Sequence, residues 1–260
     1  MWFETHAHLS DAKFDPDRDE VIERAFANSV TRIIEIADGP EEWEKARLLS
    51  EKYPGKIWWA AGLHPYFADQ ASDAVFKSLR DFATHPQFVA LGEVGLDYAK
   101  CPIPPERQKQ TLASVLQLAR EIDKPLIIHC REAFEDLMTI FRLAFDKKNS
   151  SPSPGVVHCF SGSKDQAEEL VQMGFFLGVD GPVTYPNSNI LRETLSHISP
   201  QKLVLETDSP YLPPQNYRGK RNEPGYLPLI GDALSKIMEM DPKNMATILR
   251  QNSCALFRLN

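Results

Sequence analysis

The stretch Leu126-Ile127-Ile128-His129 is a short apolar run that ends in a histidine. Its apolar residues do not alternate with polar ones, which favours a strand of a parallel sheet buried on both faces. Seven similar runs recur, each followed by a segment of helical period: Trp2 to His6, Thr31 to Ala37, Ile57 to Leu63, Val89 to Glu93, Gly155 to His158, Phe175 to Gly178 and Leu203 to Glu206. This βα rhythm predicts an α/β fold, a single (β/α)8 TIM barrel spanning residues 1–260.

The clearest helix is predicted from Pro105 to Ile122, because its apolar side chains fall on one stripe: Leu112, Val115, Leu116 and Ala119. Another helix is expected near Pro16 to Asn28. Loops are expected where Pro, Gly and Ser gather, from Ser150 to Pro154 and from Tyr211 to Pro228. The pattern shows no internal repeat and no interdomain linker.

The composition of the chain limits the partners that it is expected to bind. The net charge of -7 gives no general attraction to nucleic acid, so contact with a polyanion requires a local basic patch or bound cations. Without a signal-peptide pattern or an apolar stretch of bilayer length, we expect a cytoplasmic protein that does not contact membranes. The four cysteines form no CxxC pair and are expected to be buried thiols. No heptad or exposed apolar stripe indicates an obligate protein partner, which favours a monomer.

Histidines gather at or just beyond the ends of the strand-like runs: His6, His8, His64, His129 and His158. Catalytic groups of a TIM barrel collect at the carboxyl ends of its strands. His6 and His8 are two apart in an extended segment, so both imidazoles point to one side and offer two nitrogens to a cation. Taken alone, this pair also fits one buried and one exposed histidine.

Acidic residues mark two further strand ends, in Gly92-Glu93-Val94-Gly95 and in Glu206-Thr207-Asp208-Ser209. Buried acids and histidines are costly unless they are paired or bound to metal. Because several apolar strands each end in such a group, the sequence predicts a metal site. The glycines beside Glu93 indicate a tight rim where the backbone approaches a ligand.

In these motifs the chain resembles the TatD family of metal-dependent hydrolases, a branch of the amidohydrolase-like TIM barrels. The resemblance covers nearly the whole chain and rests on these stretches: Thr5-His6-Ala7-His8-Leu9, Gly62-Leu63-His64-Pro65, Gly92 to Tyr98, His129, His158-Cys159-Phe160, Glu206 to Leu212, and Arg218 to Pro224. One position departs from the family pattern, since Glu4 stands where Asp usually precedes Thr-His-x-His. The departure leaves the histidine pair intact and bears on the local packing.

The resemblance implies two divalent metal ions. It assigns His6, His8 and Asp208 to one ion, His129 and His158 to the other, and Glu93 to both. A carboxylate spans cations about 3.5–4 Å apart and leaves room for a bridging water as the nucleophile. Asp208 then orients this water or accepts its proton, so Asp208 and Glu93 are the predicted catalytic residues. Imidazole and carboxylate ligands favour Zn or Mn, with Mg also allowed.

Five further residues are predicted to contact the substrate: His64, Tyr98, Arg131, Arg218 and Arg221. The resemblance makes His64 a substrate or phosphate contact, and the alternative is a capping histidine in a loop. Tyr98 offers a group that supports the metal ligands or a surface on which a base stacks, and the alternative is a structural role.

The three arginines carry the case for phosphate binding. Arg131 follows the run Leu126 to His129, where its guanidinium can pair with phosphate or form a salt bridge to Glu132 or Glu135. Arg218 and Arg221 belong to the one concentrated cationic segment of the chain, which fits phosphate capture or a solvated face.

The predicted activity is hydrolysis of phosphodiester bonds with DNA as the substrate, as a nuclease that removes nucleotides from DNA ends. The resemblance includes deoxyribonucleases, and a metal pair suits phosphodiesters. One alternative is metal-dependent hydrolysis of an ester or amide, such as deacylation of aminoacyl-tRNA, because the same water can attack a carbonyl carbon. A non-catalytic binding barrel is the other, and six intact ligand positions argue against it.

Overall fold

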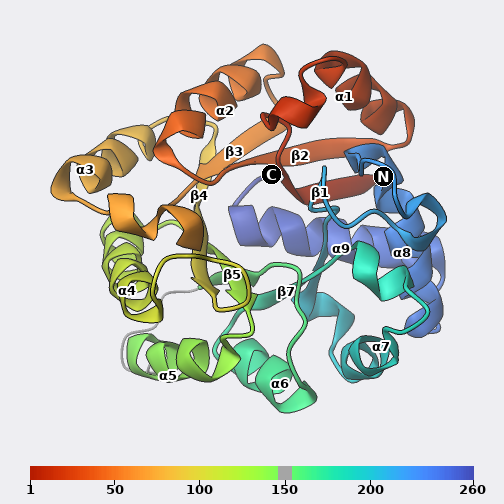
Figure 1. Ribbon diagram of the computed structural model, residues 1–260. Coiled ribbons are helices and arrows are strands. Elements are labelled where there is room, and N and C mark those ends of the chain that lie inside the picture. Colours follow the sequence, from red (N-terminus) through yellow and green to blue (C-terminus); the bar gives the residue numbers. More distant parts are fainter. Residues whose placement is uncertain (146–153) are drawn as a thin grey trace.

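The protein is described by a computed structural model that covers residues 1–145 and 154–260. Within them, eight strands form one parallel sheet in chain order: β1 (Trp2–Ala7), β2 (Val30–Ala37), β3 (Ile57–Ala61), β4 (Phe88–Asp97), β5 (Leu126–Arg131), β6 (Gly155–Val157), β7 (Phe176–Val179) and β8 (Leu203–Leu205). The end of β8 returns to β1, because Ala7 bridges Ser209 and the His8 N–H donates to the Ser209 carbonyl at 2.8 Å. The sheet is a nearly closed TIM barrel, which confirms the predicted fold (Figure 1).

Helices surround the barrel in the described residues (Figure 1): α1 (Arg18–Ala27), α2 (Pro40–Lys52), α3 (Asp73–Phe82), α4 (Pro105–Ile122), α5 (Phe134–Ala144), α6 (Lys164–Gln172), α7 (Asn189–Ser196), α8 (Leu227–Ile237) and α9 (Pro242–Phe257). The last helix packs against the start of the sheet, where Phe257 meets Phe3 with ring centroids 6.1 Å apart. None of these helices is long and apolar enough to cross a membrane.

Apolar side chains fill the barrel below its carboxyl end. This interior core takes residues from most strands and from the end of α9: Phe3, Ile34, Ile36, Ala60, Val89, Ala90, Ile127, Val156, Phe176, Val204, Leu256 and Phe257. Side chains two apart on a strand share one face. Ile127 therefore places His129 above this core, and Val156 does the same for His158, so the core carries the site.

The elements follow the predicted pattern with shifted ends. The helix at Pro105–Ile122 has its predicted bounds, whereas β4 continues to Asp97, beyond the predicted end at Glu93. The loop predicted from Tyr211 holds only the short 3-10 turns Gln215–Tyr217 and Pro224–Tyr226 before α8 begins. The loop predicted at Ser150 lies outside the described residues up to position 153.

Two glycines allow β4 to lie against β5. A Cβ on Gly95 would stand 1.9 Å from the His129 carbonyl oxygen, and one on Gly92 would stand 2.5 Å from that of Ile127. Their φ angles of +152° and +153° also favour glycine. The close backbone approach predicted around Glu93 is thus an approach to the neighbouring strand, which carries His129.

Candidate active site

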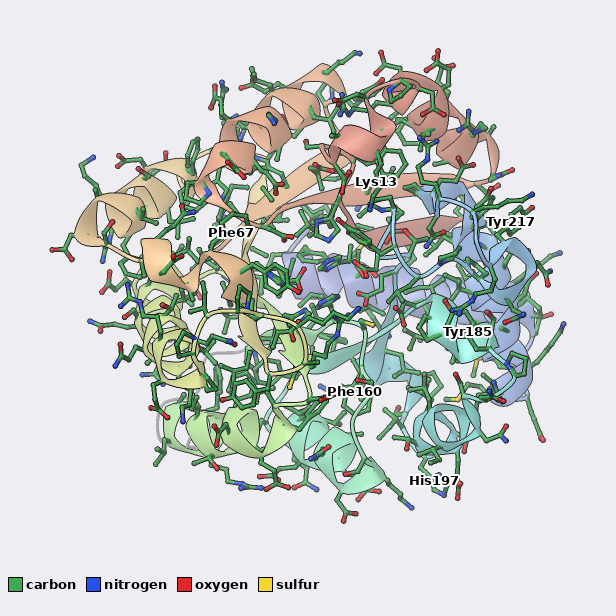
Figure 2. The ribbon with its side chains drawn as sticks, in the orientation of Figure 1. Lys13, Phe67, Phe160, Tyr185, His197 and Tyr217 are labelled. Atoms are coloured by element: carbon green, nitrogen blue, oxygen red, sulfur yellow. The ribbon has the colours of Figure 1, made fainter. Side chains whose placement is uncertain are left out.

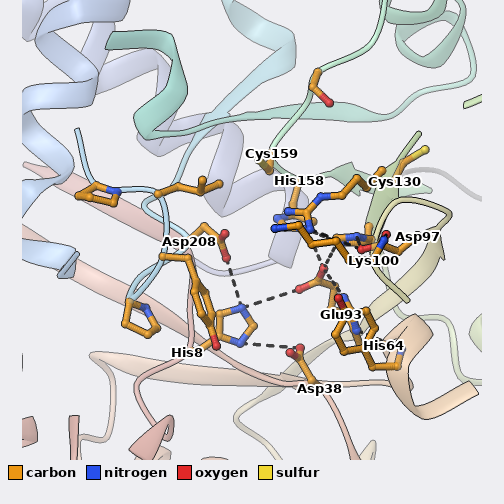
Figure 3. A pocket seen from close by; sticks show the side chains of 18 of the residues that line it. His8, Asp38, His64, Glu93, Asp97, Lys100, Cys130, His158, Cys159 and Asp208 are labelled. Carbon is orange, nitrogen blue, oxygen red and sulfur yellow. Dashed lines mark hydrogen bonds and ion pairs between the residues drawn. The ribbon is translucent and has the colours of Figure 1, made fainter. Parts of the chain in front are cut away.

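A cavity of about 680 Å³ opens at the carboxyl ends of the strands (Figure 3). Most of the predicted site residues line it: His8, His64, Glu93, His129, Arg131, His158, Asp208 and Arg218. His6 is fully buried beside them. Tyr98 and Arg221 are not among the lining residues. The barrel thus brings together strand ends that are far apart in the sequence, as their positions predict.

Glu93 stands at the centre of this group (Figure 3). Its Oε1 lies 2.6 Å from Nδ1 of His129 and 2.7 Å from Nε2 of His158. Its Oε2 lies 3.1 Å from Nε2 of His6. The two oxygens of one buried carboxylate therefore face two separate sets of imidazoles.

The donor atoms around Oε2 have the spacing of one coordination sphere. Nε2 of His6 and Nε2 of His8 are 3.2 Å apart, and Oδ1 of Asp208 lies 3.3 Å from the latter and 3.7 Å from the former. Oε2 of Glu93 is 3.8 Å from Nε2 of His8. Ligands about 2.1 Å from a tetrahedral centre are about 3.4 Å from one another. The donor atoms of His6, His8 and Glu93 lie within 4.8 Å of one another and fit the size of a single cation site, and Oδ1 of Asp208 borders them.

The set around Oε1 is more compact. Nδ1 of His129 and Nε2 of His158 are 3.2 Å apart. His64 joins this set, since its Nε2 lies 3.7 Å from Oε1 of Glu93. Its Nδ1 also accepts the N–H of Tyr66 at the start of the 3-10 turn Pro65–Gln70. His64 is thus a capping histidine that at the same time reaches the donor group.

Burial and neighbouring charges set the protonation of the donors. Burial lowers the pKa of His6 to about 4, so its imidazole is neutral at pH 7. Burial alone would raise the pKa of Glu93, but the imidazoles of His158 and His129 hold this pKa well below its usual range. Burial would raise the pKa of Asp208, but its hydrogen bond with His8 and the nearby imidazoles of His8, His6 and His158 together lower it. Burial alone would lower the pKa of His8 and His129, but nearby acids raise the first well above its usual range and the second to about 9. A divalent cation binds the neutral imidazole and would displace a proton from each.

Further carboxylates stand behind three of the histidines. Oδ2 of Asp97 is 3.3 Å from Nε2 of His129. Two more pairs have 3.7 Å between carboxylate oxygen and Nδ1, Asp38 with His8 and Glu206 with His158 (Figure 3 for Asp38). Such acceptors orient ligating imidazoles in metal sites, and of the three acids only Asp97 lies within hydrogen-bond distance of its histidine.

Sequence reasoning missed Asp38 and Glu206 as site residues. Asp38 directly follows β2, the same place relative to its strand that drew attention to the histidines, so that signal was present. Burial raises the pKa of Asp38 to about 8 and that of Glu206 well above its usual range.

Glu4 explains how the barrel seam is held where the chain departs from the family pattern. Its Oε1 accepts the N–H of His6 and the N–H of Thr207, each at 3.0 Å. The carboxyl group therefore joins β1 to the segment after β8, directly below His6 and Asp208. Burial raises its pKa to about 8. The longer side chain fits here because it reaches both backbone segments.

Two cationic side chains lie on the β4 and β5 side of the cavity. Nη1 of Arg131 is 3.5 Å from Oδ2 of Asp97. The acidic partner of Arg131 is therefore Asp97, and not Glu132 or Glu135, the two alternatives from the sequence. Lys100, which sequence reasoning did not single out, also lines the cavity. Figure 3 labels Lys100 among the residues that line the cavity.

The two arginines of the cationic segment have different surroundings. Arg218 lines the cavity and lies over the ring of Tyr185, 4.4 Å from its centroid. Arg221 donates from both terminal nitrogens to the carboxylate of Asp17, at 2.7 and 2.8 Å, and to the carbonyl of Lys13 at 2.7 Å. The segment therefore presents Arg218 and Lys220 to the cavity and uses Arg221 to anchor itself.

Tyr98 points away from the cavity. Its hydroxyl donates to Oδ2 of Asp136 at 2.7 Å, and its ring lines a separate hollow beside α5. Its predicted contact with substrate stays a prediction. The aromatic side chains that do line the cavity are Tyr66, Phe67 and Tyr211.

Comparison with known proteins agrees with the site. Residues 3–258 match the family model described as TatD related DNase. The uncharacterized metal-dependent hydrolase YabD of Bacillus subtilis (strain 168) is 36% identical over 260 residues, 100% of both chains. The 3'-5' ssDNA/RNA exonuclease TatD of Musicola paradisiaca (strain Ech703) is 35% identical over 99% of this chain and 98% of its own.

Comparison of the structure with solved structures identifies the same family. The crystal structure of YJJV, a TatD homologue from Escherichia coli K12, matches 100% of this chain and 98% of its own with a TM-score of 0.91 and 30% identity. The predicted resemblance is confirmed over the whole barrel, and the donor group at its carboxyl end is that of a metal-dependent enzyme. On this evidence the chain belongs to the TatD family and is a metal-dependent hydrolase.

Proposed function

We propose that the chain is a two-metal phosphodiesterase that removes nucleotides from the ends of DNA. The placement of Glu93 carries the proposal, because its two oxygens face two sets of donors. One divalent cation would be held by His6, His8 and Asp208, the other by His129 and His158, with Glu93 shared between them. Zn or Mn suits these imidazoles and carboxylates, and Mg is also allowed.

The donor set fits such ions on physical grounds. Lone pairs of two imidazoles and two carboxylates converge around Oε2 of Glu93 in a largely buried site, an arrangement that a cation stabilises. When bound, a metal pair supplies Lewis-acid activation of a water and of a phosphoryl oxygen.

Asp208 is the residue best placed to handle the proton. Its side chain is 12% exposed, compared with 3% for Glu93, so it borders the space that water and substrate enter. Its lowered pKa keeps it ionised. Asp208 can therefore orient the attacking water, accept its proton and return that proton to the leaving oxygen. Glu93 keeps the two donor sets in place throughout.

The surroundings of the cavity support a nucleic-acid substrate. Lys100, Arg131, Arg218 and Lys220 line it in a chain of net charge -7, and they offer donors to phosphate groups. Tyr66 and Tyr211, 42% and 43% exposed, offer faces on which bases can stack. The TatD of Musicola paradisiaca is named for exonuclease activity from the 3' end on single-stranded DNA and RNA, which supports a single strand here.

We extend the proposal to the organisation of the enzyme, as one domain of residues 1–260 that works as a monomer. The barrel strands run from β1 to β8, and α9 packs back on β1, which supports one folding unit. Light scattering coupled to size exclusion tests this, and a dimer that persists on dilution would contradict it.

The activity is tested by turnover of end-labelled single-stranded DNA, duplex DNA, RNA and an aminoacyl ester, each with Mn²⁺, Zn²⁺ or Mg²⁺. We expect release of nucleotides from single-stranded DNA and loss of that release in Glu93→Gln and Asp208→Asn. Lys45→Ala, which removes an exposed charge outside the cavity, is the control and should keep full activity. Cleavage of the ester with no cleavage of DNA would replace the nuclease by an ester hydrolase.

A further inference from the structure

Three of the four lysines and arginines that line the cavity have no acidic partner in the described residues. Across residues 1–145 and 154–260, no carboxylate oxygen lies within 4.0 Å of the charged groups of Lys100, Arg218 or Lys220. Arg131 has only Nη1 near an acid, 3.5 Å from Asp97. By contrast, Arg221 is held by two contacts to its acidic partner. In an acidic protein, unpaired cations gathered over one cavity indicate a ligand with several negative charges.

These cations form two pairs. The β4 pair is Lys100, which follows β4, and Arg131, which ends the adjacent β5. The β8 pair is Arg218 and Lys220, in the loop after β8. In a ring of eight strands in chain order, β4 and β8 stand opposite each other.

Contacts hold the β8 pair on its own side of the mouth. Arg218 lies over Tyr185, in the segment after β7, and Arg221 is bound to Asp17, in the segment after β1. Figure 2 shows Tyr185 and Tyr217 on one side of the barrel and Phe67, which lines the cavity after β3, on the other. The donor group of Glu93 therefore lies between two cationic walls.

We propose that the β4 pair and the β8 pair bind phosphates on the two sides of the scissile phosphodiester. The substrate is then a single strand that crosses the mouth of the barrel, with its cleaved bond over Glu93. This inference rests on the proposed phosphodiesterase function and adds the direction in which the strand lies.

The arrangement has a consequence for strand ends. When a DNA strand ends in a hydroxyl one nucleotide beyond the cleaved bond, it has a phosphate on only one side of that bond. One of the two cation pairs then has no phosphate to bind. A phosphate on that terminus supplies the missing charge, and so does a longer overhang. Strands with a 3'-terminal phosphate should bind more tightly than strands with a 3'-hydroxyl, and substitution of one of the two pairs should remove this difference.

The experiment measures binding of a fluorescent, phosphorothioate-linked single strand of about eight nucleotides, which resists hydrolysis, to the Mn²⁺-loaded protein. Anisotropy gives the dissociation constant between about 50 and 200 mM KCl, where each neutralised phosphate contributes about 0.7 to the log–log salt slope. The variants are Lys100→Ala/Arg131→Ala and Arg218→Ala/Lys220→Ala. Lys45→Ala/Lys243→Ala removes two exposed charges outside the cavity and is the matched control.

We expect each cavity variant to weaken binding by roughly tenfold or more and to flatten the slope by about 0.7 to 1.4, with no change in the control. A change in only one cavity variant, or in neither, overturns the two-sided arrangement. Release of nucleotides from an unmodified, end-labelled single strand by the Mn²⁺-loaded wild type is recorded in parallel. Its absence would refute the phosphodiesterase function separately, because strand binding is measured without cleavage.

Discussion

Arg221 and Lys220 are adjacent cations with different surroundings, so we expect their substitution by alanine to change different properties of the protein. Arg221 donates to Asp17 at 2.7 and 2.8 Å and to the Lys13 carbonyl at 2.7 Å, and its guanidinium lies 4.6 Å from the centroid of the Phe14 ring. Lys220 lines the cavity and makes no ion pair within the described parts of the chain. We predict that Arg221→Ala lowers stability, whereas Lys220→Ala lowers affinity for a strand.

The magnitude follows from the contacts that are lost. The side chains of Arg221 and Asp17 are 28% and 33% exposed, so the ion pair is worth about 1 kcal/mol. The charged hydrogen bond to the carbonyl and the packing on Phe14 add about as much again. The total of about 2 kcal/mol corresponds to a fall in Tm of about 4–8 °C for a chain of this size.

Urea unfolding followed by tryptophan fluorescence measures this loss, and anisotropy at several salt concentrations measures strand binding. Arg221 holds the pKa of Asp17 at about 2, below its usual value, so the pair stabilises the fold above pH 4 and loses this contribution as the pH falls through 2. The deficit of Arg221→Ala should shrink over that range. An unchanged Tm combined with a flatter salt slope in Arg221→Ala would refute the assignment of Arg221 as an anchor.

The remaining predictions concern the groups behind the donors. Burial raises the pKa of Glu4 to about 8, so its contribution to stability is complete below about pH 4.5 and is lost as the pH rises through 8, on the order of 5 kcal/mol. Glu4→Gln should flatten the stability of the metal-free protein between pH 5 and 8, and an unchanged pH profile argues against a buried acid there. Asp97→Asn should weaken metal binding about 10–100-fold in a chelator competition, because His129 loses its charged acceptor. Equal affinity would remove Asp97 from that role.

Much of the fold could be predicted because each strand carries its own local signal. The run Leu126-Ile127-Ile128 needs no distant information to indicate a buried strand, and the stripe in Pro105–Ile122 fixes a helix with its observed bounds. The extension of β4 to Asp97 could not be predicted, because Gly92 and Gly95 weaken a strand when considered alone. Only the closeness of β5 shows why they are there.

The site divides in the same way. His6, Glu93 and Asp208 could be placed together because a barrel collects its strand ends at one rim. The partner of Arg221 could not be found, since Asp17 is 204 positions away and depends on how the loop crosses α1. Tyr98 is predicted to contact the substrate from its position in the sequence, and its hydroxyl donates to Asp136 on α5, a contact that no local pattern indicates. Contacts between side chains of different segments depend on how those segments pack, and a local sequence pattern does not contain this information.

Metal analysis of the purified chain, after removal of free ions, tests the central claim most directly. Glu93 faces two donor sets, so the wild type should bind two divalent cations per chain, and Glu93→Gln should lose both the metal content and phosphodiester turnover while its circular dichroism stays unchanged. One cation in the wild type, or two cations with full turnover in Glu93→Gln, would contradict a shared carboxylate at the centre of the site.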